Sequence, residues 1–256
     1  MLIWFTYERF HSLGMPGGNN MVTALIIKAQ GTNCDEETAF ALTHVGARAE
    51  VVYVNRLLED PGMLEKYHMV VTPGGFSYGD DIAAGRLLAR ELSDPLRQYH
   101  ESGGIGIYIC NGCQVSVEAG YVPGRTGERE VAFTDNIQGH FREITVPIRS
   151  RDSRCLFIPE GMEMRLPIAH GEGRYEPASE QVHRELVEGG YVVFEFSEEN
   201  PNGSRDGVAG ITNTAGNILA MMPHPERAMI SYDSHSGRGD GYEFWKHVVN
   251  WVKQNR

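Results

Sequence analysis

The first half of the chain alternates short apolar runs with stretches in which apolar residues recur at helical spacing. Short apolar runs between turn residues are typical of buried strands, whereas apolar residues three or four positions apart are typical of amphipathic helices. These patterns predict strands over 22–28, 49–54, 67–72 and 104–109, and helices over 35–45, 81–92 and 114–120. Strands that alternate with helices predict an α/β fold, a parallel sheet with helices on both faces.

The second half is richer in strand patterns, which clusters of glycine and proline separate. Strands are predicted over 131–134, 141–148, 163–169, 191–196, 207–212 and 217–222. A terminal helix is predicted over 241–254, and its apolar stripe is typical of core packing. Since no linker or repeat interrupts residues 21–256, we expect them to form a single domain.

Residues 1–20 differ from the rest of the chain. They hold four aromatic residues followed by a cluster of glycine, proline and asparagine over 14–20. They lack the basic start and the uninterrupted apolar stretch of a secretory signal. Because Met21 leads directly into a predicted strand, we expect residues 1–20 to be a mis-assigned start or a disordered tail.

Composition and charge narrow the class of protein. The formal net charge of −11 argues against nucleic acid or an anionic membrane surface as the main partner. No apolar run approaches the length of a membrane span. Four cysteines in 256 residues do not form a disulfide framework, so a reduced, cytoplasmic setting is expected.

Cys110 is the strongest candidate for chemistry. It follows the apolar run 105–109 and precedes a helical pattern, which is the strand–turn–helix layout of a nucleophile elbow. The start of the helix would favour the thiolate form. The layout alone is equally compatible with a buried structural cysteine. In an open parallel sheet, however, ligands bind at the carboxyl ends of strands, where Cys110 and the segment 73–76 both fall.

Cys110 and Cys113 also form a C-x-x-C pair at a helix start, which is the spacing of redox motifs. The strand before them is the fourth predicted strand rather than an early one, which disfavours this interpretation. A zinc site would need a second pair of ligands, whereas Cys34 and Cys155 stand alone in the sequence. We therefore expect no metal and no cofactor in this chain, and we expect Cys113 to pack in the core.

His224 and Glu226 are the candidates for a general base and its partner. At positions i and i+2 of an extended segment their side chains would share a face. A carboxylate beside an imidazole fixes its tautomer and stabilises its charged form, and Pro223 and Pro225 would stiffen the segment. A surface loop with an incidental histidine remains the alternative.

The segment 73–80, Pro-Gly-Gly-Phe-Ser-Tyr-Gly-Asp, follows a predicted strand. Its two glycines let backbone N–H groups turn toward a ligand, which suits an oxyanion hole. Asn111, the residue after the candidate nucleophile, would supply a second N–H. A plain glycine turn is the alternative, and a phosphate-binding loop is disfavoured because the sequence lacks its G-x-x-x-x-G-K-[ST] motif.

Three segments together resemble a class I (triad) glutamine amidotransferase. They are 73–80, 110–114 and 223–227. More narrowly, the chain resembles the glutaminase subunits of phosphoribosylformylglycinamidine synthase, an enzyme of purine biosynthesis, with further matches over 30–35, 168–175 and 200–204. The resemblance covers about residues 22–256, and six motifs in the same order are far more specific than any one of them.

The resemblance implies a flavodoxin-like fold and a triad. Cys110 would attack the side-chain amide of glutamine and form a glutamyl thioester. His224 would act first as the base and then as the acid for the leaving ammonia, and Glu226 would orient His224. The backbones of Gly75 and Asn111 would form the oxyanion hole.

The resemblance also implies a substrate contact and partners. Gln114 would help to bind L-glutamine. Ammonia would pass through a channel to a separate synthetase subunit, which uses ATP and magnesium to convert formylglycinamide ribonucleotide to its amidine. A small third subunit bridges the two in many relatives, and glutamine hydrolysis by the chain alone is expected to be slow.

Some positions depart from the family pattern. Relatives have glycine where Tyr108 stands and phenylalanine where Cys113 stands, and they have serine and arginine where Gln138 and His140 stand. Tyr108 must therefore find room beside the elbow, and Gln138 and His140 are expected to influence glutamine binding.

Three other functions fit parts of the pattern. Tyr108 leaves open a catalytically weak regulatory subunit on the same fold. Another hydrolase with an elbow cysteine, such as a peptidase, is disfavoured by the His-Pro-Glu segment and by Gln114. A thiol–disulfide oxidoreductase would require Cys113, which an amidotransferase would not.

Overall fold

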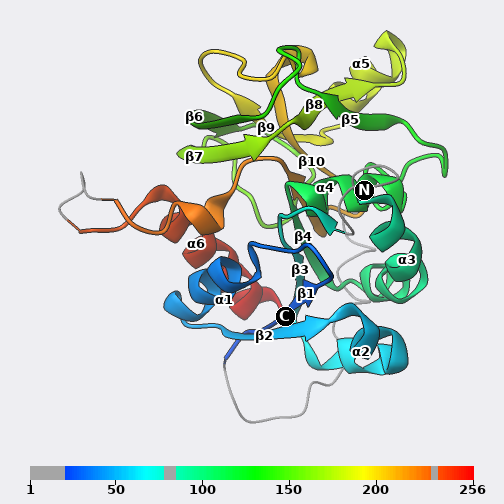
Figure 1. Cartoon of the computed structure of the whole chain (residues 1–256), viewed down its shortest axis with the longest axis vertical. Coiled ribbons are helices and arrows are strands. Elements are labelled where there is room, and N and C mark those ends of the chain that lie inside the picture. The colour runs from blue at the N-terminus through cyan, green and yellow to red at the C-terminus, as the bar shows by residue number, and fades with distance from the viewer. Residues whose placement is uncertain (1–20, 78–84, 232–235) are drawn as a thin grey trace, which may run out of the picture.

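A nine-stranded sheet runs through the molecule, and its first half is parallel (Figure 1). The structure is a computed structural model that describes residues 21–77, 85–231 and 236–256, so the expected extension over 1–20 lies outside the described residues. The parallel strands, in spatial order, are β2 (Arg48–Tyr53), β1 (Thr23–Lys28), β3 (Met69–Thr72), β4 (Ile105–Ile109) and β11 (Ile218–Met221). Each coincides with a predicted strand to within two residues at either end.

Four more strands continue the sheet as antiparallel neighbours. They are β10 (Val208–Thr212), β9 (Val192–Phe196), β6 (Arg142–Ser150) and β7 (Glu163–His170). The flavodoxin-like α/β class is confirmed, and four of the strands predicted in the second half extend the parallel sheet.

A small second sheet pairs β5 (Val131–Asp135) with β8 (Glu172–Pro177). The sequence pattern predicts β5 but not β8. Tyr175 is the only large apolar side chain that β8 buries, and its neighbours in the strand are mostly charged. The period-2 pattern of a strand is therefore too weak in this segment to detect.

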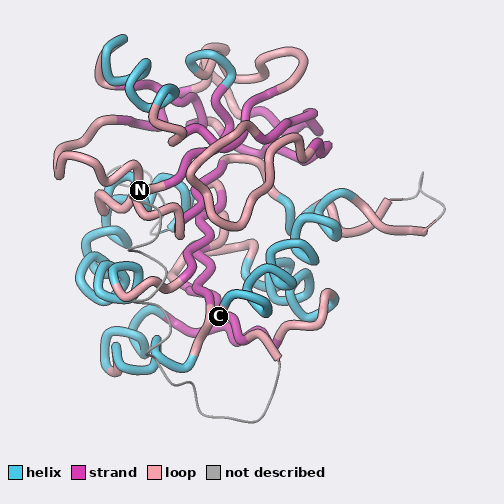
Figure 2. The backbone as a smooth tube through the Cα atoms, turned by 180° about the vertical axis from the view of Figure 1, so that it is seen from behind, coloured by secondary structure: helices cyan, strands magenta, loops and turns pink. Residues whose placement is uncertain are grey.

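Helices cover both faces of the parallel strands (Figures 1 and 2). On one face, α1 (Asp35–His44) packs against α6 (Asp240–Asn255). On the other, α3 (Arg86–Glu101) packs against α4 (Asn111–Glu118) and against the short helix α2 (Val54–Glu59), which the sequence pattern does not predict. Strands β3 and β4 are buried along their whole length, as expected of a sheet covered twice. In the described part of the chain no helix is long and apolar enough to cross a membrane.

The predicted end of this helix, at residue 92, is wrong, because α3 continues to Glu101. Residues 81–84 lie outside the described residues, and Gly85 has a left-handed φ of 76° just before the first turn. The helix continues past Pro95 because its buried stripe extends through Leu96 to Tyr99. The free energy gained by burying that stripe exceeds the cost of the backbone hydrogen bond that proline removes.

The helix α5 (Glu180–Glu188) is absent from the sequence prediction. Ser179 caps it by accepting a hydrogen bond from the N–H of Val182 at 3.2 Å. The helix buries only His183 and Leu186, so its apolar stripe is narrow. A serine followed by glutamate at its start and paired glycines at its end are the signals that identify it.

Strand register brings three distant segments to one edge of the sheet. In neighbouring strands Thr72 pairs with Tyr108, and Ile109 pairs with Met221. The chain therefore leaves β3, β4 and β11 at the same level, and the residues that follow lie side by side. These are the segments that contain the predicted oxyanion loop, nucleophile and base, at the carboxyl edge where open α/β sheets bind ligands.

Candidate active site

Cys110 occupies a strained turn between β4 and α4. Its φ of 52° and ψ of −110° are rare for a residue other than glycine. Its N–H donates to the carbonyl of Met221 at 2.8 Å, which fixes the turn to the end of β11. Asn111 is the first residue of α4, so its N–H lies at the amino end of that helix, next to the Cys110 turn.

Tyr108 fits beside the elbow because a glycine two residues earlier makes room for it. A Cβ atom on Gly106 would lie 2.8 Å from the Tyr108 ring and 2.6 Å from His100. Tyr108 is fully buried, and its hydroxyl donates to His100 Nε2 at 2.7 Å. Burial lowers the pKa of His100 to about 4, so this histidine is neutral and accepts that bond. The Tyr108 side chain is therefore accommodated in the core next to the elbow, where it packs against His100 and hydrogen-bonds to it.

His224 and Glu226 lie in direct contact. His224 Nδ1 is 2.6 Å from Glu226 Oε1, and both residues are buried. The predicted reason for this contact is wrong, because Pro225–Arg227 forms a 3₁₀ turn rather than an extended segment. The turn brings the carboxylate back onto the ring, while the N–H of His224 donates to the carbonyl of Pro167 in β7 at 2.8 Å.

The charge state of His224 depends on its neighbours. Burial disfavours the charged imidazolium and lowers its pKa, but attraction to the negative charges of Glu226 and Cys110 has the larger, opposite effect. The pKa of His224 is therefore raised well above its usual value. An imidazole that is stabilised in its charged form beside a thiol suits proton transfer from that thiol.

The tight space around Gly74 shows how close the predicted residues lie. A Cβ atom on Gly74 would be 2.7 Å from His224 Cε1 and 3.3 Å from the Cβ of Cys110. It would also lie 3.4 Å from the sulfur of Cys34. The predicted base, the predicted nucleophile and a second cysteine thus surround one glycine of the predicted oxyanion loop.

The oxyanion loop is held by the segment that precedes α1. Thr32 and Gly75 form an antiparallel bridge, in which the N–H of Asn33 donates to Gly74 and the N–H of Phe76 donates to Gly31. Neither bond uses the N–H of Gly75. The φ of Gly75 is 153°, and a Cβ there would lie 2.6 Å from the Gly31 carbonyl oxygen. Only glycine allows this approach.

Asn111 connects the oxyanion loop to the predicted substrate-binding residue. Its Oδ1 accepts hydrogen bonds from the N–H and the hydroxyl of Ser77, at 3.2 and 2.6 Å. Its Nδ2 donates to Gln114 Oε1 at 3.1 Å, and Gln114 Nε2 donates to the carbonyl of Glu172 at 2.9 Å. The loop, α4 and β8 are thereby held in one arrangement. Residues 78–80 of the motif lie outside the described residues.

Two further residues lie next to this arrangement. His170 begins the glycine-rich segment 170–174, for which the sequence allows either the partner-facing mouth of the site or an ordinary turn, and Asn136 was not selected from the sequence. Buried His170 hydrogen-bonds through Nδ1 to Asn136 Oδ1 at 3.0 Å, and burial lowers the pKa of His170 to about 4. Both stand in segments that match the family, which is the signal that could have identified them. Gln138 and His140, by contrast, are exposed and bond to the backbone carbonyls of Pro201 and Phe141.

Cys34 is not isolated in the folded protein. Its sulfur lies 3.9 Å from His224 Nδ1. The sequence interpretation that treats it as a single cysteine is therefore wrong in space, because α1 begins at the same edge of the sheet as the other site segments. Cys113 is fully buried, as expected of a core residue.

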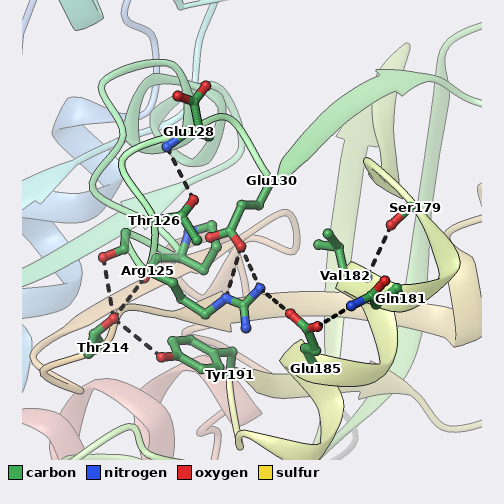
Figure 3. A network of polar contacts seen from close by, with 12 residues as sticks. Arg125, Thr126, Glu128, Glu130, Ser179, Gln181, Val182, Glu185, Tyr191 and Thr214 are labelled. Carbon is green, nitrogen blue, oxygen red and sulfur yellow. Dashed lines mark hydrogen bonds and ion pairs between the residues drawn. The ribbon is translucent and has the colours of Figure 1, made fainter.

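A separate polar network stabilises the second half of the chain and contains none of the predicted site residues (Figure 3). Arg125 pairs with Glu130 at 2.5 Å and with Glu185 of α5 at 2.9 Å. The guanidinium also lies 5.7 Å from the centre of the Tyr191 ring. These contacts join the loop after α4 to α5 and to the residue before β9.

Comparison with known proteins defines the class. Residues 21–252 match the family of CobB/CobQ-like glutamine amidotransferase domains. Phosphoribosylformylglycinamidine synthase subunit PurQ of Thermus thermophilus is 40% identical over 238 residues, which cover 89% of this chain and 97% of that protein. The PurQ subunit of Dehalococcoides mccartyi is 35% identical over an alignment of 256 positions, which covers 91% of this chain and 98% of that protein.

A solved structure agrees with these relatives. The structure of PurLQS from Thermotoga maritima contains a chain with a TM-score of 0.73 and 29% identity to this one, and the match covers 91% of this chain and 99% of that chain. The chain belongs to the glutamine amidotransferase family, in the group of PurQ proteins. The resemblance drawn from the six sequence motifs is confirmed.

Proposed function

We propose that this chain is the glutaminase subunit of phosphoribosylformylglycinamidine synthase. It hydrolyses L-glutamine to glutamate and ammonia, and the ammonia passes to an ATP-dependent synthetase subunit that makes formylglycinamidine ribonucleotide. The observation that carries the proposal is the strained elbow of Cys110 beside the buried His224–Glu226 pair, at the strand edge shared with Gly75. The PurQ relatives support the particular reaction.

The first half of the reaction forms a thioester. Glu226 accepts a hydrogen bond from the Nδ1–H of His224, which leaves Nε2 to take the proton of the Cys110 thiol. In the described residues this buried Nε2 has no hydrogen-bond partner, so it is available for the transfer. The sulfur attacks the amide carbon, and the N–H groups of Gly75 and Asn111 stabilise the oxyanion.

The second half releases the products. His224 returns its proton to the departing nitrogen as the carbon–nitrogen bond breaks, and ammonia leaves. A water molecule then gives a proton to His224 and attacks the thioester, which frees glutamate and restores the thiol of Cys110. Gln114, which accepts a hydrogen bond from Asn111 next to the nucleophile, helps to bind glutamine.

The partners follow from the same proposal. ATP, magnesium and the nucleotide bind to the large synthetase subunit, and this chain holds no cofactor for the reaction. A small third subunit bridges the two, and the complex works in the cytoplasm. The four free, buried cysteines are consistent with a reducing compartment.

The proposed function is tested by ammonia release from glutamine. The purified chain is assayed alone and with its synthetase partner, ATP and formylglycinamide ribonucleotide, beside a Cys110→Ala control. We expect release that the partner stimulates and that the control lacks. Absence of release under every condition, with the protein folded, would refute the proposal and favour a catalytically weak subunit. Release by the Cys110→Ala chain would refute the assignment of the nucleophile.

A further inference from the structure

A cluster of three potential metal ligands lies at the predicted base. Cys34, His224 and Glu226 are all buried, and one ligand atom from each lies within 4.8 Å of the others. The Cys34 sulfur is 3.9 Å and Glu226 Oε1 is 2.6 Å from His224 Nδ1. The second carboxylate oxygen of Glu226 is buried and has no hydrogen-bond partner among the described residues, so it carries unused capacity to bind a cation.

We propose that Cys34, His224 and Glu226 form an inhibitory binding site for a divalent transition-metal ion such as Zn²⁺. Thiolate, imidazole and carboxylate are the ligands that this ion prefers in proteins. The two anionic ligands together balance its charge, which a buried site requires. The fourth position of a tetrahedral ion is left for water.

The separations between the ligand atoms are close to those of a tetrahedral zinc site. Bonds of about 2.0–2.3 Å place a nitrogen and a sulfur ligand about 3.5 Å apart, and a nitrogen and an oxygen ligand about 3.4 Å apart. The sulfur must therefore approach His224 Nδ1, now 3.9 Å away, by about 0.4 Å. The carboxylate of Glu226 must retreat by about 0.8 Å from its present 2.6 Å.

A surface groove borders the cluster. It has a volume of about 700 Å³, and its lining includes Asn33, which precedes Cys34, and Glu226 itself. Glu36 and Glu37 line the same groove and are exposed, so they raise the local concentration of cations. Arg227 is the opposing charge in this lining, and it is paired with Glu143 at 3.1 Å.

A bound metal ion would prevent His224 from acting as the general base. This inference rests on the role proposed for His224. The Cys34 thiol loses its proton to solvent when it binds the ion. The ion replaces the proton on Nδ1, which is lost to solvent, and displaces the hydrogen bond to Glu226. The neutral imidazole then carries its remaining proton on Nε2. An Nε2 that already bears a proton cannot accept one from Cys110.

Metal binding is measured on the metal-free chain without glutamine. Equilibrium dialysis against Zn²⁺ gives the stoichiometry and the affinity for the unaltered protein, Cys34→Ser and Cys110→Ala. Cys155→Ser is the matched control, because it removes another buried cysteine. We expect one ion per chain in the unaltered protein, in Cys110→Ala and in Cys155→Ser. In Cys34→Ser the affinity should fall by at least about tenfold, since even outer-shell changes cost that much.

Cobalt supplies a second measurement that does not depend on a variant. Co²⁺ bound by a thiolate gives an intense near-ultraviolet charge-transfer band, and a tetrahedral site gives strong visible bands. We expect both in the unaltered chain, and a spectrum without the thiolate band would overturn the proposal. Loss of binding in Cys110→Ala, with full binding in Cys34→Ser, would also overturn the proposal. The ion would then be bound by Cys110, where glutamine reacts, and not by Cys34.

Inhibition is measured in the assembled synthetase. Zn²⁺ should lower the glutamine-dependent rate and leave the rate with added ammonium salt unchanged, and Cys34→Ser should need at least about tenfold more Zn²⁺ for the same loss. Equal sensitivity of the two chains would refute inhibition through this cluster. A chain that binds zinc at Cys34 but never hydrolyses glutamine would instead refute the proposed function, so the two failures are distinguishable.

Discussion

Acid is expected to destabilise the fold through His100, the buried histidine beneath the nucleophile elbow. Burial lowers the pKa of His100 from 6.5 to about 4, while its Nε2 accepts the hydroxyl proton of Tyr108. The unfolded chain therefore binds a proton at a higher pH than the folded chain does. The stability that depends on a neutral His100 is present above about pH 6.5 and is lost as the pH falls toward 4.

The size of the effect follows from the two pKa values. Each pH unit between them changes the free energy of unfolding by about 1.4 kcal/mol per histidine. Lowering the pH from about 7 to about 5 therefore costs about 2 kcal/mol through His100 alone. The pKa of His170 is also lowered to about 4, so it adds a comparable loss.

A variant isolates the contribution of His100. In His100→Gln the amide oxygen can still accept the hydroxyl of Tyr108, but the side chain no longer titrates. The free energy of unfolding is measured by urea denaturation near pH 7 and near pH 5 for both chains. The unaltered chain should lose about 2 kcal/mol more than His100→Gln. Equal losses in the two chains would show that His100 is not held neutral and would refute the account of the elbow.

Three further predictions concern the site and the network that supports it. Glu226→Gln should keep the fold and lower kcat for glutamine by roughly 10⁴-fold, as in the comparable serine-protease triad, and a rate within tenfold of the original would exclude Glu226 as the orienting residue. Cys113→Ser should retain glutaminase activity and lose about 1 kcal/mol of stability by burying a hydroxyl; loss of activity in a folded chain would contradict a packing role. Arg125→Ala should lower the free energy of unfolding by roughly 3 kcal/mol, because it leaves the Glu130 carboxylate buried without its cation. Thermal denaturation at matched pH measures this change, and an unchanged melting temperature would show that the ion pair contributes nothing to stability.

The parallel half of the fold is predictable because its signals are local. Strands buried on both faces are short continuous apolar runs, and the helices between them carry broad apolar stripes. The elements that escaped prediction lack such signals. Strand β8 buries one large apolar side chain, and α5 buries only His183 and Leu186.

The residues of the candidate site could be predicted from the sequence, but their arrangement in space could not. Cys110 stands in a strand–turn–helix pattern, which is local, and His224 and Glu226 are only two positions apart. That Gly75 and Cys110 follow adjacent strands is decided by sheet order, which no local pattern contains. The turn that joins His224 to Glu226 also differs from the expected extended segment.

The sequence by itself determined the class of fold, the family and the identity of the candidate triad, because residue types at short spacings carry those signals. Only the tertiary structure decided how Tyr108 is accommodated, through the missing side chain of Gly106 and the hydrogen bond to His100. Only the tertiary structure placed Cys34 beside His224, 190 positions away in the chain. Contacts of this kind depend on which strands become neighbours, and the burial of the whole sheet selects that order.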